Sequence, residues 1–138
     1  QLSLERLADE PVDYVGGLEM GAVPLAACLA QASRDTARPL PAFFVRKKAK
    51  EHGAKLRVEG LPPGETLNGK HVVVLEDVTT TGGSSLQAIQ QVRDEGGIVA
   101  LAVTIVDRLE GAADTLADAG VTLAPLLTAD DFDVPSDS

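Results

Sequence analysis

Glu76 and Asp77 are adjacent carboxylates followed at once by a run of threonine and glycine, residues 79–83, and then by Ser84. Free backbone N–H groups, hydroxyls and closely approachable glycines at the start of a helix bind phosphate. Carboxylates repel phosphate, but they accept hydrogen bonds from hydroxyl groups or bind a metal ion. A phosphorylated sugar satisfies both demands. The run is neither a Walker A motif nor Gly-x-Gly-x-x-Gly, and an ordinary strand-to-helix turn capped by Ser84 is the structural alternative.

A second cluster is basic. Residues 46–57 contain six of the chain's 12 Lys and Arg and one acid, Glu51, in a protein of net charge -9. The overall negative charge argues against a general nucleic-acid partner. A small basic island suits a compact, highly charged anion better than a long polymer. A solvated surface loop is the alternative interpretation.

Hydrophobic patterning supplies the elements that must position these residues. It predicts strands at 12–15, 42–45, 56–59, 71–75, 98–106 and 121–127, helices at 21–32, 84–95 and 111–119, a turn at Gly16-Gly17, turn-rich chain at 60–69, and a frayed tail at about 130–138. The alternation predicts an α/β fold with a mainly parallel central sheet flanked by helices. Such sheets bind ligands at the carboxyl ends of their strands, where Glu76-Asp77 and Asp107-Arg108 both fall.

Composition limits the remaining possibilities. A length of 138 residues fits one domain, 1–138, and no apolar run is long enough to cross a bilayer, so we expect a cytoplasmic protein with no membrane partner. The single Cys28 excludes an internal disulfide, and we expect it in the core; we expect no protein metal site. His71 opens a strand and is expected to be structural, whereas Glu19 could assist a ligand or simply face solvent.

Two segments resemble a known family. Residues 72–84, VVVLEDVTTTGGS, resemble the phosphoribosyl pyrophosphate (PRPP) signature of the type I phosphoribosyltransferases. Residues 46–53, RKKAKEHG, resemble the mobile catalytic loop of the orotate branch, and this second motif is far more specific. The likeness runs from about residue 13 to 127, with residues 16–21, GGLEMG, at the pyrophosphate-loop position. Some members carry a lysine there, whereas this chain has Gly21 at or beside that position.

The resemblance implies a type I phosphoribosyltransferase fold, with the family's N-terminal hood segment missing or truncated here, and a flexible catalytic loop at about 46–57. It implies orotate phosphoribosyltransferase activity, which makes orotidine 5-monophosphate and pyrophosphate from orotate and PRPP in pyrimidine (UMP) biosynthesis. Implied catalytic residues are Lys47, Lys50, His52 and Asp77. Implied PRPP-binding residues are Arg46, Lys47, Lys50, His52, Glu76, Asp77, Val78, Thr79, Thr80, Thr81, Gly82, Gly83 and Ser84, and implied orotate-binding residues are Thr80 and Arg108.

The resemblance further implies Mg²⁺ bound mainly through PRPP and a homodimer with shared active sites. His52 could act as a proton donor to pyrophosphate or only as a hydrogen-bonding cation. Two other functions stay open: a phosphoribosyltransferase for a different base, and a non-catalytic PRPP-sensing regulator. The basic loop favours the enzyme, because a sensor has no need of a clamp on a leaving group.

Overall fold

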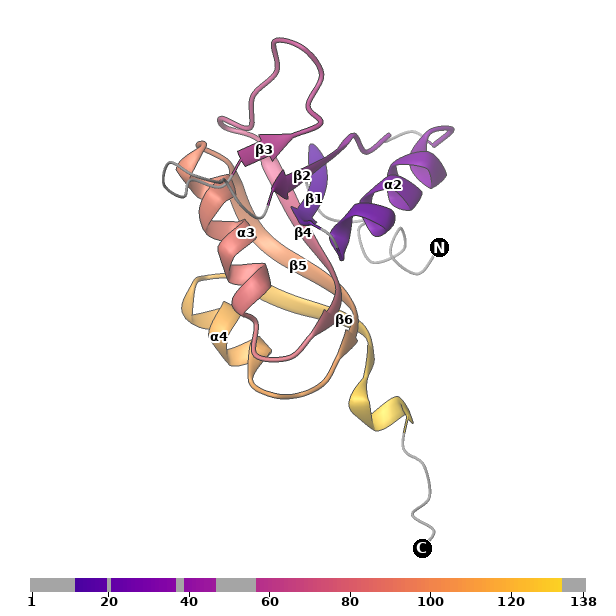
Figure 1. Ribbon diagram of the computed structural model, residues 1–138, viewed down its shortest axis with the longest axis vertical. Helices are drawn as coiled ribbons and strands as arrows, with labels where there is room; N and C mark the ends of the chain where they lie inside the picture. Colours follow the sequence, from indigo (N-terminus) through magenta and orange to yellow (C-terminus); the bar gives the residue numbers. More distant parts are fainter. Residues whose placement is uncertain (1–11, 20, 37–38, 47–56, 133–138) are drawn as a thin grey trace, which may run out of the picture.

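Alternating apolar strands and amphipathic helices build a six-stranded sheet with helices on both faces (Figure 1). The computed structural model describes residues 12–19, 21–36, 39–46 and 57–132. Its elements are β1 (Tyr14–Leu18), α2 (Ala22–Ser33), β2 (Ala42–Arg46), β3 (Arg57–Glu59), β4 (His71–Thr79), α3 (Gly83–Asp94), β5 (Ile98–Asp107), α4 (Ala112–Asp118), β6 (Thr122–Thr128) and the 3-10 helix η1 (Ala129–Phe132). The strand order is β3-β2-β1-β4-β5-β6, and only the β2–β3 pair is antiparallel. The prediction of a mainly parallel α/β sheet is confirmed.

The strand β4 lies between two apolar layers. Val72 and Val74 pack in the layer that contains residues of α3 and α4, whereas Val73 and Leu75 pack in the layer that contains residues of α2. Figure 1 shows α2 on one side of the sheet and α3 with α4 on the other. Because successive strand residues point to opposite faces, a strand covered on both faces needs apolar residues at every position. This explains the unbroken apolar run in β4.

The chain changes direction between β1 and β4, which are neighbours in the middle of the sheet. From β1 it passes through α2 to β2 on one side, and from β4 it passes through α3 to β5 on the other. In open parallel sheets the crevice for a ligand lies beyond the carboxyl ends of the strands at such a point. The ends of β1 and β4 are therefore the place to look for a site.

The prediction of a turn at Gly16-Gly17 is wrong, because both glycines lie inside β1. A Cβ atom on Gly16 would sit 2.4 Å from the carbonyl oxygen of Phe43, and one on Gly17 would sit 2.3 Å from that of Leu75. Glycine is required here by close neighbouring backbone, a condition that local sequence does not reveal.

Other boundaries also differ from the predictions. The strand β4 continues past residue 75 to Thr79, because residues 76–79 pair with Thr104–Asp107 of β5. Arg46, predicted to begin the loop at about 46–57, is the last residue of β2 and pairs with Arg57 of β3. The strand predicted at 56–59 is described as Arg57–Glu59, so Arg57 is a strand residue as that prediction had it. In the predicted frayed tail, residues 130–132 belong to η1, where the carboxylate of Asp131 accepts a hydrogen bond from the backbone N–H of Thr128 at 2.7 Å; residues 133–138 lie outside the described part.

Cys28 is exposed, so its predicted core position is also wrong. The buried residues of α2 are Ala22, Ala26, Leu29 and Ser33, and Cys28 lies off that stripe. Since small and apolar residues surround this helix on all sides, hydrophobic spacing alone could not tell its buried face from its outer face. No helix in the described part of the chain is long and apolar enough to cross a membrane.

Candidate active site at the carboxyl ends of β1 and β4

Glu76 points toward α3 from near the end of β4. The residue is buried, with an exposed fraction of 8%, and its Oε1 accepts a hydrogen bond of 3.1 Å from the Oγ of Ser85. Ser85 stands in the first turn of α3 and is itself only 1% exposed. A buried carboxylate needs such partners, because an unsatisfied one is costly in a low-dielectric environment. Glu76 is therefore held between the sheet and α3.

Asp77 points to the opposite face, as the next residue of a strand must. Its side chain is exposed, and its Oδ1 accepts a hydrogen bond of 2.8 Å from the backbone N–H of Val78. It lies against Gly21, which precedes α2: a Cβ on Gly21 would be 2.6 Å from Oδ1 of Asp77. The two acids that the sequence placed side by side are thus supported by different helices, at the point where β1 and β4 diverge.

A hollow of about 300 Å³ opens beside Glu76 and is lined by Glu76, residues 78–85 and Gln87. This volume is at the lower end of the range for small-molecule pockets, roughly 300–1,000 Å³. Gly82, with φ of 96°, turns the chain into α3 in the left-handed conformation that glycine adopts readily. No side chain caps α3, so the N–H groups of its first turn lack that partner. The predicted phosphate loop therefore surrounds a cavity that has both a carboxylate and backbone donors.

The threonines of this loop are not equivalent. Thr79 is the last residue of β4 and is 3% exposed, and its hydroxyl donates to the carbonyl oxygen of Val106 at 3.4 Å. Thr80 and Thr81 are exposed and line the hollow. Val78, predicted as a binding residue, also lines the hollow and is 46% exposed despite being apolar. The structure thus leaves the hydroxyls of Thr80 and Thr81, rather than that of Thr79, beside the open space.

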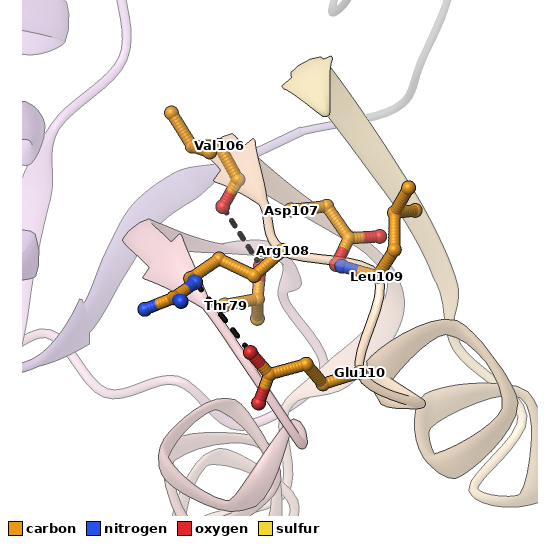
Figure 2. A network of polar contacts seen from close by, with 6 residues as sticks. All are labelled: Thr79, Val106, Asp107, Arg108, Leu109 and Glu110. Atoms are coloured by element: carbon orange, nitrogen blue, oxygen red, sulfur yellow. Dashed lines mark hydrogen bonds and ion pairs between the residues drawn. The ribbon is translucent and has the colours of Figure 1, made fainter. Parts of the chain in front are cut away.

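The end of β5 lies beside the end of β4, and Figure 2 shows the polar contacts around it. The backbone N–H of Arg108 donates to the carbonyl oxygen of Thr79 at 2.9 Å, which ties this turn to the end of β4. The Arg108 guanidinium pairs with Glu110 at 3.5 Å, with side chains 59% and 45% exposed, so the pair is weak and the guanidinium is open to solvent. Asp107 is buried and accepts a hydrogen bond of 2.9 Å from the N–H of Leu109, whose φ is 62°. Asp107 therefore shapes the turn that presents Arg108.

Arg46 ends β2, whose carboxyl end lies on the same edge of the sheet because β2 runs parallel to β1. Its Nε atom pairs with Oε2 of Glu59 in β3 at 3.3 Å. Arg46 is also the first residue of the basic motif 46–53. Lys47, Lys50 and His52 lie outside the described residues.

Sequence reasoning missed Ser85, which it treated only as part of a helix start. A signal was present: Ser85, Ile89 and Val92 follow helical spacing, and all three are buried. A serine on the core-facing stripe of a helix needs a hydrogen-bonding partner, and the acids Glu76 and Asp77 end the strand that precedes this helix. Asp107 was predicted as part of a polar cluster at the ligand edge, whereas its carboxylate instead stabilises the turn.

The chain is similar to known proteins in both sequence and structure. A family model described as the phosphoribosyl transferase domain matches residues 1–132. An orotate phosphoribosyltransferase from Bradyrhizobium diazoefficiens is 58% identical over 132 residues, which are 96% of this chain and 71% of the relative. One from Streptomyces coelicolor is 48% identical, over 88% of this chain and 65% of the relative. The crystal structure of Mycobacterium tuberculosis orotate phosphoribosyltransferase in complex with PRPP is similar with a TM-score of 0.80 at 36% identity, covering 96% of this chain and 72% of that one.

Proposed function

The chain belongs to the phosphoribosyl transferase domain family, and within it to the orotate phosphoribosyltransferases; from this premise we propose that it transfers the phosphoribosyl group of PRPP to orotate. The C–O bond between the ribose and pyrophosphate breaks, and a bond forms between the same ribose carbon and a ring nitrogen of orotate. The products are orotidine 5-monophosphate and pyrophosphate. The reaction belongs to pyrimidine (UMP) biosynthesis.

The observation that carries this proposal is the hollow beside Glu76. It combines a buried carboxylate with the uncapped first turn of α3 and exposed threonine hydroxyls. The carboxylate suits ribose hydroxyls, and the backbone donors with the positive end of the helix dipole suit the 5-phosphate. The arrangement therefore supports a phosphorylated sugar as ligand.

The other residues complete the substrate in this proposal. Residues 79–84 hold the 5-phosphate, and Asp77 accepts a hydrogen bond from a ribose hydroxyl on the α2 side. Thr80 and Arg108 bind orotate, whose carboxylate a guanidinium can bind with paired hydrogen bonds. Two observations support this role for Arg108: its side chain is exposed, and it follows the end of β5 next to the end of β4.

Departing pyrophosphate gathers negative charge while the ribose becomes positive, so catalysis requires cations at the leaving group and exclusion of water. We assign this task to Arg46, Lys47, Lys50 and His52, because Arg46 stands at the ligand edge and the other three follow it in the chain. His52 can serve as proton donor or as a cation. In the homodimer that we propose, this segment acts on the site of the neighbouring subunit.

Magnesium enters this scheme as part of the substrate. Mg²⁺ prefers one or two carboxylates together with substrate phosphate oxygens and water. The described residues contain no group of three or more His, Cys, Asp or Glu side chains suited to a metal, whereas Asp77 offers an exposed carboxylate at the same edge. The residues thus fit Mg²⁺ bound mainly through PRPP, where it would neutralise pyrophosphate charge. A cytoplasmic location stays a prediction.

The test is an assay of orotate consumption with PRPP and Mg²⁺, run in parallel with adenine and hypoxanthine. We expect turnover with orotate and none with adenine or hypoxanthine. Asp77→Asn should lower PRPP affinity and turnover by about 10-fold or more, because a charge-assisted hydrogen bond becomes a neutral one. The matched control is Asp118→Asn, which alters an exposed carboxylate at the C-terminal end of α4. This variant should change neither PRPP affinity nor turnover. Turnover with a purine base would overturn the choice of orotate, and PRPP binding without turnover of any base would indicate a sensor.

A further inference from the structure

We infer that Ser85 is a positioning residue for PRPP, which acts by holding the carboxylate of Glu76 in place through their hydrogen bond. This inference rests on the proposed function, since it assigns Glu76 to a ribose hydroxyl. It adds a residue that lies outside the phosphate-binding run 79–84 and whose role is to orient Glu76.

Burial is the first argument. Ser85 is 1% exposed and Glu76 8%, and the Ser85 Oγ lies 3.1 Å from Oε1 of Glu76. Hydrogen bonds to a charged partner are stronger than neutral ones, and the effect grows where water is excluded. Both residues line the same hollow. The contact therefore acts on a carboxylate that faces the space for the ligand.

Position on the helix is the second argument. Ser85 occupies the buried stripe of α3 with Ala88, Ile89 and Val92, where an apolar residue would be ordinary. A hydroxyl there must be satisfied, and it reaches back nine residues to β4 to find its acceptor. The serine thus joins Glu76, near the end of β4, to the start of α3, where the backbone N–H groups proposed to bind phosphate lie.

The length of the acid makes its positioning matter more. Glutamate has one more rotatable bond than aspartate, so fixing its carboxylate costs more conformational entropy. A donor that holds one oxygen in the free protein meets that cost before the ligand arrives, which raises affinity by preorganisation. Asp77, which is shorter and lies on the other face against Gly21, is held by different contacts.

The experiment compares Ser85→Ala with Ser33→Ala. Ser33 is a buried serine of α2 that donates to the carbonyl oxygen of Ala30 at 2.9 Å and accepts from the N–H of Leu40 at 2.8 Å, away from the hollow. For each variant we would measure the Kd of Mg²⁺–PRPP by calorimetry, the KM values of both substrates, and Tm. Ser85→Ala should raise the Kd and KM for PRPP by about 10-fold and leave the KM for orotate unchanged. Ser33→Ala should lower Tm without changing the Kd for PRPP or the KM of either substrate.

A second background separates positioning from a structural role. In Glu76→Gln, Ser85→Ala should raise the Kd for PRPP by less than about 2-fold, because residues that act together are not additive. An unchanged PRPP affinity in Ser85→Ala, or the same loss in both backgrounds, overturns the role of Ser85 while leaving the proposed function intact. If the unaltered chain fails to bind Mg²⁺–PRPP, the proposed function and this inference both fall, and calorimetry without a base distinguishes that result.

Discussion

Replacing Gly21 by alanine should damage PRPP use while leaving the fold intact. The new Cβ would lie 2.6 Å from Oδ1 and 3.0 Å from Cγ of Asp77, closer than such atoms can approach. Gly21 has φ of -56° and ψ of -36°, a helical conformation that alanine adopts without strain. The atoms that must yield are therefore those of the Asp77 carboxylate, which can rotate away.

The magnitudes separate stability from activity. A glycine-to-alanine change at a compatible backbone position stabilises by about 0.4–1 kcal/mol, and moving Asp77 off its rotamer costs about 0.5–1.5 kcal/mol. These nearly cancel, so the free energy of unfolding should change by less than about 1 kcal/mol. Loss of the proposed hydrogen bond from a ribose hydroxyl to the charged Asp77 carboxylate costs about 1.5–3 kcal/mol. This cost corresponds to a decrease of about 10- to 150-fold in kcat/KM for PRPP.

Gly17→Ala is the contrasting variant. Its Cβ would lie 2.3 Å from the carbonyl oxygen of Leu75 and 2.7 Å from the Cβ of Ala22, so the neighbouring strand itself must move. Overpacking of this kind costs about 1–3 kcal/mol or more, and each kcal/mol lowers Tm by roughly 3–6 °C for a chain of this size. Thermal unfolding and kcat/KM measured on both variants should therefore show opposite profiles.

A double variant supplies the decisive control for Gly21. If Gly21→Ala acts through Asp77, it should add little to the loss already caused by Asp77→Ala. Normal kcat/KM for PRPP in Gly21→Ala would refute the reasoning, because it would show that the carboxylate can be displaced without consequence. A further 10-fold loss on the Asp77→Ala background would show that the alanine acts on another part of the site.

Other predictions concern the base, the shared site and a tyrosine. Arg108→Ala should raise the KM for orotate much more than that for PRPP, since in the proposed site the guanidinium pairs with the orotate carboxylate; an equal rise in both would indicate a structural arginine. Lys50→Ala should lower turnover by roughly 100-fold with unchanged Tm, and subunit exchange between it and inactive Asp77→Asn should restore part of the activity; mixed dimers that stay inactive would exclude a loop acting across subunits. Hydrogen bonding to the carboxylate of Glu65, together with burial, raises the pKa of Tyr14 to about 12. The folded state therefore still binds this proton at pH values above the ordinary tyrosine pKa of about 10. The stability that the folded state gains from it is complete below pH 10 and is lost as pH rises toward 12. Tyr14 is the only tyrosine and the chain has no tryptophan, so its ultraviolet titration is directly visible, and it should move back toward pH 10 in Glu65→Gln.

The amino-acid sequence alone determined the kinds of elements and the chemistry of the loop after β4. Continuous β-branched residues marked the central strand, and the threonines and glycines before Ser84 marked the start of α3, because these patterns reflect local backbone preference and local burial. The confirmed α/β class follows from their order. The motif at 46–53 identified the orotate branch before any geometry was known.

Tertiary structure decided which residues meet. Glu76 and Asp77 are neighbours in sequence, yet the pleat of β4 sends one to Ser85 and the other to Gly21. The glycines of β1, the extension of β4 to Thr79 and the exposure of Cys28 likewise depend on elements that are distant in the chain. Such contacts leave no periodic signal in a local window, because they arise only when strands pair and helices pack. The sequence thus specifies the groups of the site, and the packing of α2 and α3 on opposite faces of the sheet specifies how each acid is held.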